Sequence, residues 1–286
     1  MTFPEEELRV RIGEALAEAL RGGETRLDAA MTHALLAGGK RLRPILTCLW
    51  GARFGADPEA ALRAGLAVEW VHTYSLVHDD LPCMDDDDLR RGKPTVHKLY
   101  GEAMGVLAGD ALLTQAFGLM TSLPNTDPSR ALSAVARLVK GAGSRGMVLG
   151  QVQDLEGKAR DRYQVLRVHY RKTGCLLRAA AGIGAILGGA TDEELERVEA
   201  FASHLAVAFQ ALDDLLDVTG DTETLGKPVG SDEHRDLPTL VGVMGVDGCR
   251  ALVDDETDAA IAKLDLDQPH EARLADLTRW LMNRDH

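Results

Sequence analysis

The chain has 286 residues, of which 45% are hydrophobic and 27% are charged, proportions typical of a globular protein. Its 45 acidic and 32 basic side chains give a net charge of −13, which argues against binding to a nucleic-acid backbone. The four cysteines are widely spaced, so neither a zinc site nor a disulfide framework is expected. The N-terminus is acidic where a signal peptide would be basic, and the longest uncharged apolar run, 179–190, is too short to span a membrane. We therefore expect a cytoplasmic protein with reduced thiols.

Helical patterns run through the chain from its beginning. Residues 6–20 and 191–218 carry apolar side chains at intervals of three and four and are rich in strong helix formers. Alternating β-branched runs are scarce, and clusters of Gly and Pro separate the helical segments, the longest such stretch being 219–238. These patterns predict an all-α protein, with residues 1–286 forming a single-domain helical bundle.

The first acidic segment closes a long apolar helix, predicted over 66–80. Asp79 and Asp80 end it, and Pro82 then interrupts the helix because proline lacks an N–H donor. This interruption lets Asp85 turn back toward the first pair. Three further aspartates follow, and we expect some of them only to be solvated: Asp86, Asp87 and Asp88.

A second acidic segment lies in a helix predicted over 201–217. At 3.6 residues per turn, Asp213 and Asp217 lie about 40° apart on one helix face, with Gln210 one turn earlier. A solvated acidic face is the alternative for this stripe, but the flanking leucines are too apolar for a fully exposed helix. One bundle that brings the two acidic helices face to face is the simplest arrangement.

The two acidic segments predict a site for divalent cations. Carboxylates this close repel one another unless they are solvated or share a cation. Oxygen ligands without a His or Cys cluster favour Mg²⁺ or Ca²⁺ over zinc, and the alternating pattern of a calcium-binding loop is absent. Mg²⁺ commonly completes its octahedron with water and phosphate oxygens, which suggests a multi-phosphate substrate held between the segments. Basic residues that could meet phosphate charge occur in several short segments: Lys40, Arg41, Arg43, Arg90, Arg91, Lys172 and Lys227.

Six motifs resemble, in order and at plausible separations, those of one protein family: "GGKRLRP", "HTYSLVHDDLPCMDDDDLRRGKPTVH", "GQVQDLE", "KTG", "FQALDDLLDVTGD" and "TLGKPVGSD". The family is the trans-type isoprenyl diphosphate synthases, or polyprenyl synthetases, in their bacterial short-chain form. The resemblance covers about Ala37 to Asp232. It implies the type I isoprenoid synthase fold, a helical bundle with a deep central cavity and the two aspartate motifs facing each other across its mouth, usually as a homodimer.

The resemblance also implies roles for individual residues. Mg²⁺ would be bound by Asp79, Asp85 and Asp213, with Asp80 in support and with Asp214 and Asp217 acting indirectly or through water. The allylic diphosphate would be held by Arg90, Lys172 and Lys227. Isopentenyl diphosphate would be held by Lys40, Arg43, His72 and Arg91, although by its apolar surroundings alone His72 would be taken as a hydrogen-bonded core histidine. Near the reacting carbons would lie Thr173 and Gln210, which with Lys172 and Lys227 make up the expected catalytic set.

The implied reaction is an Mg²⁺-dependent, head-to-tail condensation of isopentenyl diphosphate with an allylic diphosphate, either dimethylallyl or geranyl. Ionisation of the allylic C–O bond places negative charge on the departing diphosphate, which metal ions and basic side chains stabilise. The allylic cation then alkylates the isopentenyl double bond, and a proton leaves to the diphosphate. No protein nucleophile is required, in agreement with the lack of a Ser-His-Asp or Cys-His signature.

Product length is expected to depend on the floor of the cavity. Tyr74 lies five residues before Asp79, or about 7.5 Å along a helix. Its bulky ring beside the small Ser75 is similar to the family arrangement that stops elongation at C15, farnesyl diphosphate. The alternatives are that Tyr74 is simply one more packed aromatic residue and that the product is C20, geranylgeranyl diphosphate.

The chain departs from the family pattern after "GKPVGSD", where a further Lys is usual and Leu237 and Pro238 stand here. A diphosphate contact is expected to be missing there unless Arg235 replaces it. Three other kinds of protein are alternatives to a synthase. A class I terpene cyclase would normally lack the second aspartate motif, whereas a non-catalytic partner subunit or an acidic cation-binding protein would be expected to lack the first-motif aspartates or Lys40 and Arg43.

Overall fold

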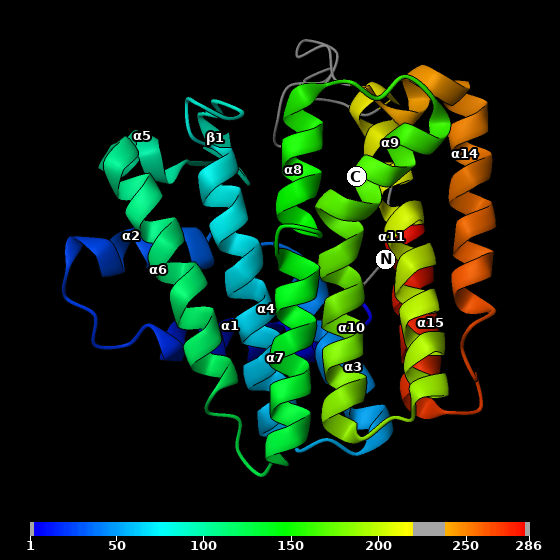
Figure 1. The fold of residues 1–286 in the computed structure, drawn as a ribbon, viewed down its shortest axis with the longest axis horizontal. Coiled ribbons are helices and arrows are strands. Elements are labelled where there is room, and N and C mark those ends of the chain that lie inside the picture. Colours follow the sequence, from blue (N-terminus) through cyan, green and yellow to red (C-terminus); the bar gives the residue numbers. More distant parts are fainter. Residues whose placement is uncertain (1–2, 220–237, 284–286) are drawn as a thin grey trace.

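The computed structural model describes residues 3–219 and 238–283, and almost all of this part is helical (Figure 1). The α-helices are, in chain order, α1 (Glu6–Ala19), α2 (Arg26–Leu35), α3 (Leu42–Phe54), α4 (Pro58–Asp79), α5 (Val96–Tyr100), α6 (Glu102–Met120), α7 (Pro128–Ala142), α8 (Met147–Glu156), α9 (Arg162–His169), α10 (Cys175–Gly188), α11 (Asp192–Thr219), α14 (Leu240–Ile261) and α15 (Pro269–Met282). A π-helix, η1 (Tyr170–Gly174), joins α9 to α10. Within the described residues, the sheet is a hairpin of two antiparallel strands, β1 (Leu89–Arg90) and β2 (Lys93–Pro94). The all-α prediction is confirmed.

The core forms where α10 packs against α3, α7 and α11. The larger hydrophobic cluster is mostly aliphatic, but its largest fully buried side chains are aromatic: Trp50, Trp70 and Phe201. α10 approaches α3 closely because a Cβ at Gly184 would overlap the carbonyl group of Thr47. The Thr47 hydroxyl donates a hydrogen bond of 2.9 Å to the Ala180 carbonyl. This glycine contact and this hydrogen bond fix the register of the two central helices.

Helix α4 carries the first acidic segment to one end of the bundle. Its start is fixed by the Asp57 carboxylate, which accepts from the N–H groups of Glu59 and Ala60 at 3.0 and 2.9 Å. Pro58 at the first helical position has a φ angle already suited to the helix. α4 then ends at Asp79, at the same end of the molecule as the last turn of α11 (Figure 1). Because α10 packs against both α4 and α11, the two acidic segments share one end of the fold.

The π-helix η1 lies against α8. A Cβ at Gly150 on α8 would overlap the backbone nitrogen of Lys172, so only glycine permits this approach. Wider helical turns of this kind are frequent at functional sites. η1 contains both Lys172 and Thr173, two of the predicted site residues.

Candidate active site

The turn after α4 brings the third aspartate of the first segment back toward the first. The N–H of Asp85 donates to the carbonyl oxygen of Asp79 at 2.8 Å, and the N–H of Asp86 donates to that of Leu81 at 3.1 Å. Pro82 lies within this turn, where no helical hydrogen bond needs its missing N–H. The structure therefore places Asp79 and Asp85 side by side, as the sequence predicts.

The Asp79 carboxyl group has an unusual affinity for protons. Burial raises its pKa to about 7, and the neighbouring charges of Asp85 and Asp80 add to this, while Lys172 and Arg90 act in the opposite direction. A bound cation would stabilise the ionised form of this carboxylate in addition to the stabilisation from Lys172 and Arg90. This electrostatic environment fits a cation ligand.

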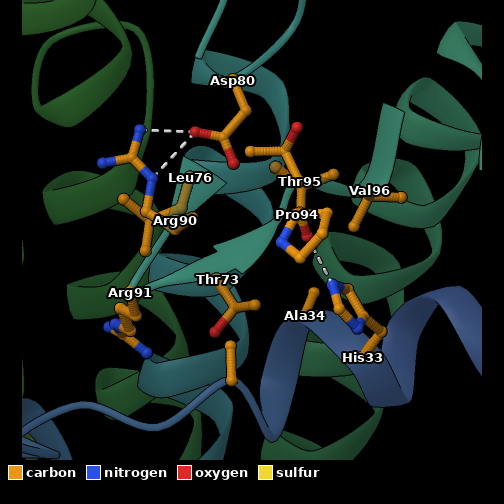
Figure 2. A pocket seen from close by; sticks show the side chains of 12 residues that line it. His33, Ala34, Thr73, Leu76, Asp80, Arg90, Arg91, Pro94, Thr95 and Val96 are labelled. Carbon is orange, nitrogen blue, oxygen red and sulfur yellow. Dashed lines mark hydrogen bonds and ion pairs between the residues drawn. The ribbon is translucent and has the colours of Figure 1, made fainter. Parts of the chain in front are cut away.

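Asp80 is paired with Arg90 rather than open to the site. Arg90 donates two hydrogen bonds to one Asp80 oxygen, that from Nε measuring 2.8 Å (Figure 2). Its Nη2 also lies 2.8 Å from Asp87. Asp80 is buried, and this burial raises the pKa of its carboxyl group against the lowering effect of Arg90. Asp86 and Asp88 are exposed, and Asp88 forms an ion pair of 2.6 Å with Lys98. Arg90 thus holds the loop after α4 in place.

Two pockets differ in size and in their relation to these motifs. A small one beside the Asp80–Arg90 pair, lined also by Thr73 and Arg91, has a volume of about 20 Å³ (Figure 2). That is room for roughly one water molecule, so it is not a cavity for a diphosphate. A pocket of about 460 Å³ lies near the beginning of α4, between α1, α3 and α15, and contains no residue of the acidic motifs.

His72 and Arg43 form the centre of a basic cluster. Burial lowers the pKa of the His72 imidazole well below its usual range, and Arg43, Arg91 and other nearby guanidinium groups lower it further. Burial also lowers the pKa of Arg43 to about 10, and its Nε is buried without a hydrogen-bond partner among the described residues. An unmet buried donor costs roughly 1–3 kcal/mol, which an anionic ligand would offset.

The other basic residues of this region are held by a carboxylate, by backbone carbonyl groups and by an aromatic ring. Arg41 is buried and structural, since it donates to Glu69 and to the Leu35 carbonyl at 2.6 Å each. Arg91 donates to the Gly38 carbonyl, and its guanidinium lies where a side chain at residue 39 would otherwise be. The Lys40 ammonium lies 5.7 Å from the centre of the Phe209 ring. The "GGKRLRP" turn and the hairpin are therefore in contact.

The three aspartates of α11 lie in different environments. Asp214 is buried and accepts from the N–H of Leu240 at 2.7 Å, so it fixes the start of α14. Asp217 is also buried, with 2% of its surface exposed. Asp213 is partly accessible, and its charge acts on Arg43 across the site. Although Asp213 and Asp217 lie on one helix face, Asp213 is partly exposed and Asp217 is buried.

Lys172 connects α8 with the first aspartate motif. Its Nζ lies 2.5 Å from the Asp154 carboxylate. Burial alone would lower the pKa of the Lys172 ammonium, but Asp154, Asp79 and Asp85 together raise it. The next residue, Thr173, donates to the Gln210 side-chain oxygen at 2.9 Å, and Gln210 donates weakly to Asp214 at 3.4 Å. η1 therefore links the two acidic segments.

Gln151 lies on α8, in the motif "GQVQDLE". In the structure both polar atoms of its carboxamide are buried without a hydrogen-bond partner among the described residues. It lies one helical turn before Asp154, the partner of Lys172. The signal in the sequence was the motif "GQVQDLE", which does not by itself distinguish a packing glutamine from one that meets a ligand.

The expected chain-length residues lie on α4 below Asp79. Tyr74 is buried, with 7% of its surface exposed. This burial raises the pKa of its phenol, and the negative charge of Asp79 raises it further. The Ser75 hydroxyl donates to the His72 carbonyl at 2.8 Å.

The expected diphosphate ligand Lys227 lies outside the described residues, as does Leu237.

Comparison with known proteins identifies the class to which this fold and this site belong. Residues 24–272 match the family model described as polyprenyl synthetase. The chain is 42% identical over 268 residues to farnesyl diphosphate synthase of Geobacillus stearothermophilus, covering 92% of this chain and 90% of the relative. It is also 42% identical over 286 residues to a chloroplastic geranylgeranyl pyrophosphate synthase of Capsicum annuum, covering 98% and 78%.

A solved structure agrees with these relatives. The geranyltransferase of Helicobacter pylori, complexed with magnesium and isoprenyl diphosphate, superposes with a TM-score of 0.82 and 29% identity, covering 99% of this chain and 98% of that one. The fold is that of a trans-prenyltransferase. The chain belongs to the polyprenyl synthetase family. The resemblance seen in the motifs and the prediction of a prenyltransferase are thereby confirmed.

Proposed function

We propose that this prenyltransferase condenses isopentenyl diphosphate with dimethylallyl and geranyl diphosphate to give farnesyl diphosphate, and that it requires Mg²⁺. The observation that carries the proposal is the arrangement of charge at one end of the bundle. Asp79, Asp85 and Lys172 interact on one side, and Asp213 and Arg43 interact on the other. Cations and carboxylates so placed suit a diphosphate bridged to the protein by metal.

The residues fit the metal that the proposal requires. Asp79, Asp85 and Asp213 would hold Mg²⁺, because they offer hard oxygen ligands and each is partly exposed, whereas Asp214 is buried. When bound, the ion neutralises charge on the leaving diphosphate. Asp80 would act in support by fixing Arg90, and Asp217 would act only indirectly, since it is buried.

The basic residues would divide between the two substrates. Lys172 lies near Asp79 and Asp85 and would hold the allylic diphosphate, together with Arg90 and Lys227. The buried Nε of Arg43 has no hydrogen-bond partner in residues 3–219 and 238–283, which supports the assignment of Arg43 to isopentenyl diphosphate. The remaining ligands of that substrate would be Lys40, His72 and Arg91. Because His72 is neutral, it would contribute a hydrogen bond rather than charge.

Thr173 and Gln210 would lie beside the reacting carbons. The Thr173 hydroxyl donates a hydrogen bond to Gln210, so the lone pairs of its oxygen remain available to face positive charge. An oriented oxygen dipole can stabilise the allylic cation without reacting with it, whereas a free nucleophile would capture it. Gln151 is a further candidate for contact with a ligand here, because its buried carboxamide has no hydrogen-bond partner in the part of the chain that the structure describes.

A C15 product is proposed because Tyr74 is a buried bulky side chain below Asp79. The ring would form the floor of the central cavity, and Ser75 would leave room beside it. The second candidate is a C20 product, since the chain is as similar to a geranylgeranyl pyrophosphate synthase as to a farnesyl diphosphate synthase.

We also propose a cytoplasmic homodimer formed from one domain spanning 1–286. The neighbouring helices α6, α7 and α8 carry exposed apolar side chains: Val106, Leu107, Leu132, Val139, Val148 and Val152. Such a face favours contact with a second copy. Within the described residues, α6 alone is long and apolar enough to cross a membrane by length and composition, and a third of its apolar window is buried. A dimer contact would explain its apolar outer face.

The experiment that tests the function is incubation of the purified protein with labelled isopentenyl diphosphate and, separately, C5, C10 and C15 allylic diphosphates. Products are dephosphorylated and separated by chromatography, with and without a chelator. Product that ends at C15, appears only with Mg²⁺ and is lost in Asp79→Asn supports the proposal. A C20 product would overturn the chain-length assignment, and no condensation with any starter would overturn the substrate assignment.

A further inference from the structure

Two glycines of α6 let the end of α4 lie directly against α6. A Cβ at Gly105 would come within 2.9 Å of the Leu81 side chain, and a Cβ at Gly109 would overlap the His78 ring. Both glycines are buried, and α4 and α6 pack against each other. His78 therefore occupies space that a side chain at residue 109 would fill.

The imidazole of His78 is fixed on two sides. Its Nε2 lies 3.1 Å from the carbonyl oxygen of Val106, and because a carbonyl only accepts, Nε2 carries the proton. On the other side the ring meets that of Tyr74 edge to face, with centroids 5.7 Å apart and planes at 79°. A chain of contacts thus runs from the α6 backbone through His78 to Tyr74.

We propose that His78 is a positioning residue for product length, which holds the Tyr74 ring in the orientation that closes the cavity floor. This rests on the proposed role of Tyr74. Residues 74 and 78 are one helical turn apart, so their side chains are neighbours on the same face of α4. Without the imidazole, the space against Gly109 is empty and the phenol ring can turn into another staggered position. The floor then opens toward α6 and a longer chain fits.

The test is the product distribution of His78→Ala with geranyl diphosphate as the starter. The ratio of C20 to C15 product is expected to rise roughly tenfold or more, the discrimination that a change of this size in an apolar pocket supports. His204→Ala is the matched control, because it removes the same ring from α11, where His204 pairs with Glu256 at 2.7 Å. Its product ratio is expected to equal that of the unaltered protein.

Two further variants test whether His78 acts on product length through Tyr74 or in another way. His78→Phe keeps a ring against Tyr74 and is expected to restore the C15 product even if the rate falls. Because His78 acts through Tyr74, the double variant Tyr74→Ala with His78→Ala is expected to give the same distribution as Tyr74→Ala alone. A merely structural role would lower the rate without changing the ratio of products.

The outcomes distinguish the inference from the function on which it rests. If Tyr74→Ala lengthens the product but His78→Ala, folded by circular dichroism, does not, the inference is overturned and the proposed floor stands. If the two changes lengthen the product additively, His78 acts independently of Tyr74 and the inference is overturned as well. If Tyr74→Ala leaves the product length unchanged, both the floor and the role of His78 are overturned.

Discussion

His72 shows how a single residue can be tuned by the cluster around it. Its imidazole is kept neutral by burial and by several guanidinium groups, so the folded protein binds a proton there less readily than the unfolded chain. Below the ordinary histidine pKa of about 6.5, the unfolded chain gains a proton that the folded protein does not. Stability therefore falls as the pH decreases from neutrality through this window.

The stability of the His72→Gln variant is expected to depend less on pH between 7 and about 5 than that of the unaltered protein, because the titrating group is gone. The measurement is denaturant unfolding at several pH values, with His33→Gln as the control on α2. An equal pH dependence in His72→Gln and the unaltered protein would contradict the assigned pKa shift.

Substitutions of two adjacent aspartates on α11 are expected to differ in effect, one lowering stability and the other lowering activity. Asp214→Ala should lower the free energy of unfolding by roughly 1–3 kcal/mol, because the buried N–H of Leu240 loses its acceptor. Asp213→Ala should leave stability nearly unchanged and lower kcat by about 10²- to 10³-fold, as expected for loss of a group that stabilises the transition state.

Urea unfolding and steady-state kinetics on both variants make the comparison. A stable but inactive Asp214→Ala, together with an active Asp213→Ala, would reverse the assignment of which carboxylate serves the ligand and which serves the fold.

At the scale of elements, α6 offers a matched pair of glycines. Alanine is the better helix former by about 0.8–1 kcal/mol, so Gly118→Ala, with nothing within 4 Å of its added Cβ, should stabilise the protein by up to that amount. The Cβ that Gly109→Ala adds would overlap the His78 ring, so this change should destabilise the protein by roughly 1–3 kcal/mol, as overpacking usually does. Thermal and urea unfolding measure both. Equal effects of the two changes would mean that α4 and α6 do not pack as the structure has them.

At the scale of the whole molecule, the apolar outer face of α6 predicts a dimer that one charge can disrupt. Leu107 on α6 is 54% exposed, and Leu266, after α14, is 50% exposed. Leu107→Glu is expected to yield monomers because the desolvated charge would lie in the contact, whereas Leu266→Glu is expected to remain dimeric. Sedimentation equilibrium distinguishes the two. A protein that is monomeric before any change would contradict the proposed interface.

The sequence by itself determined the helical class, the two acidic segments and the family. Helical periodicity and Gly-Pro breaks are local properties, and the return of Asp85 toward Asp79 followed from the missing N–H of Pro82. The six motifs identified the family because their residues and their order are specific when found together.

Only the tertiary structure decided which of these residues are open to a ligand. It buried Asp217, committed Asp214 to the start of α14 and paired Arg90 with Asp80 and Asp87. It also left polar groups of Arg43 and Gln151 with no hydrogen-bond partner among the described residues. Periodicity fixes which residues share a helix face, but the neighbouring element that covers the face comes from a distant part of the chain. Burial, pKa and access to a ligand depend on that neighbour, and so they arise only when the helices pack.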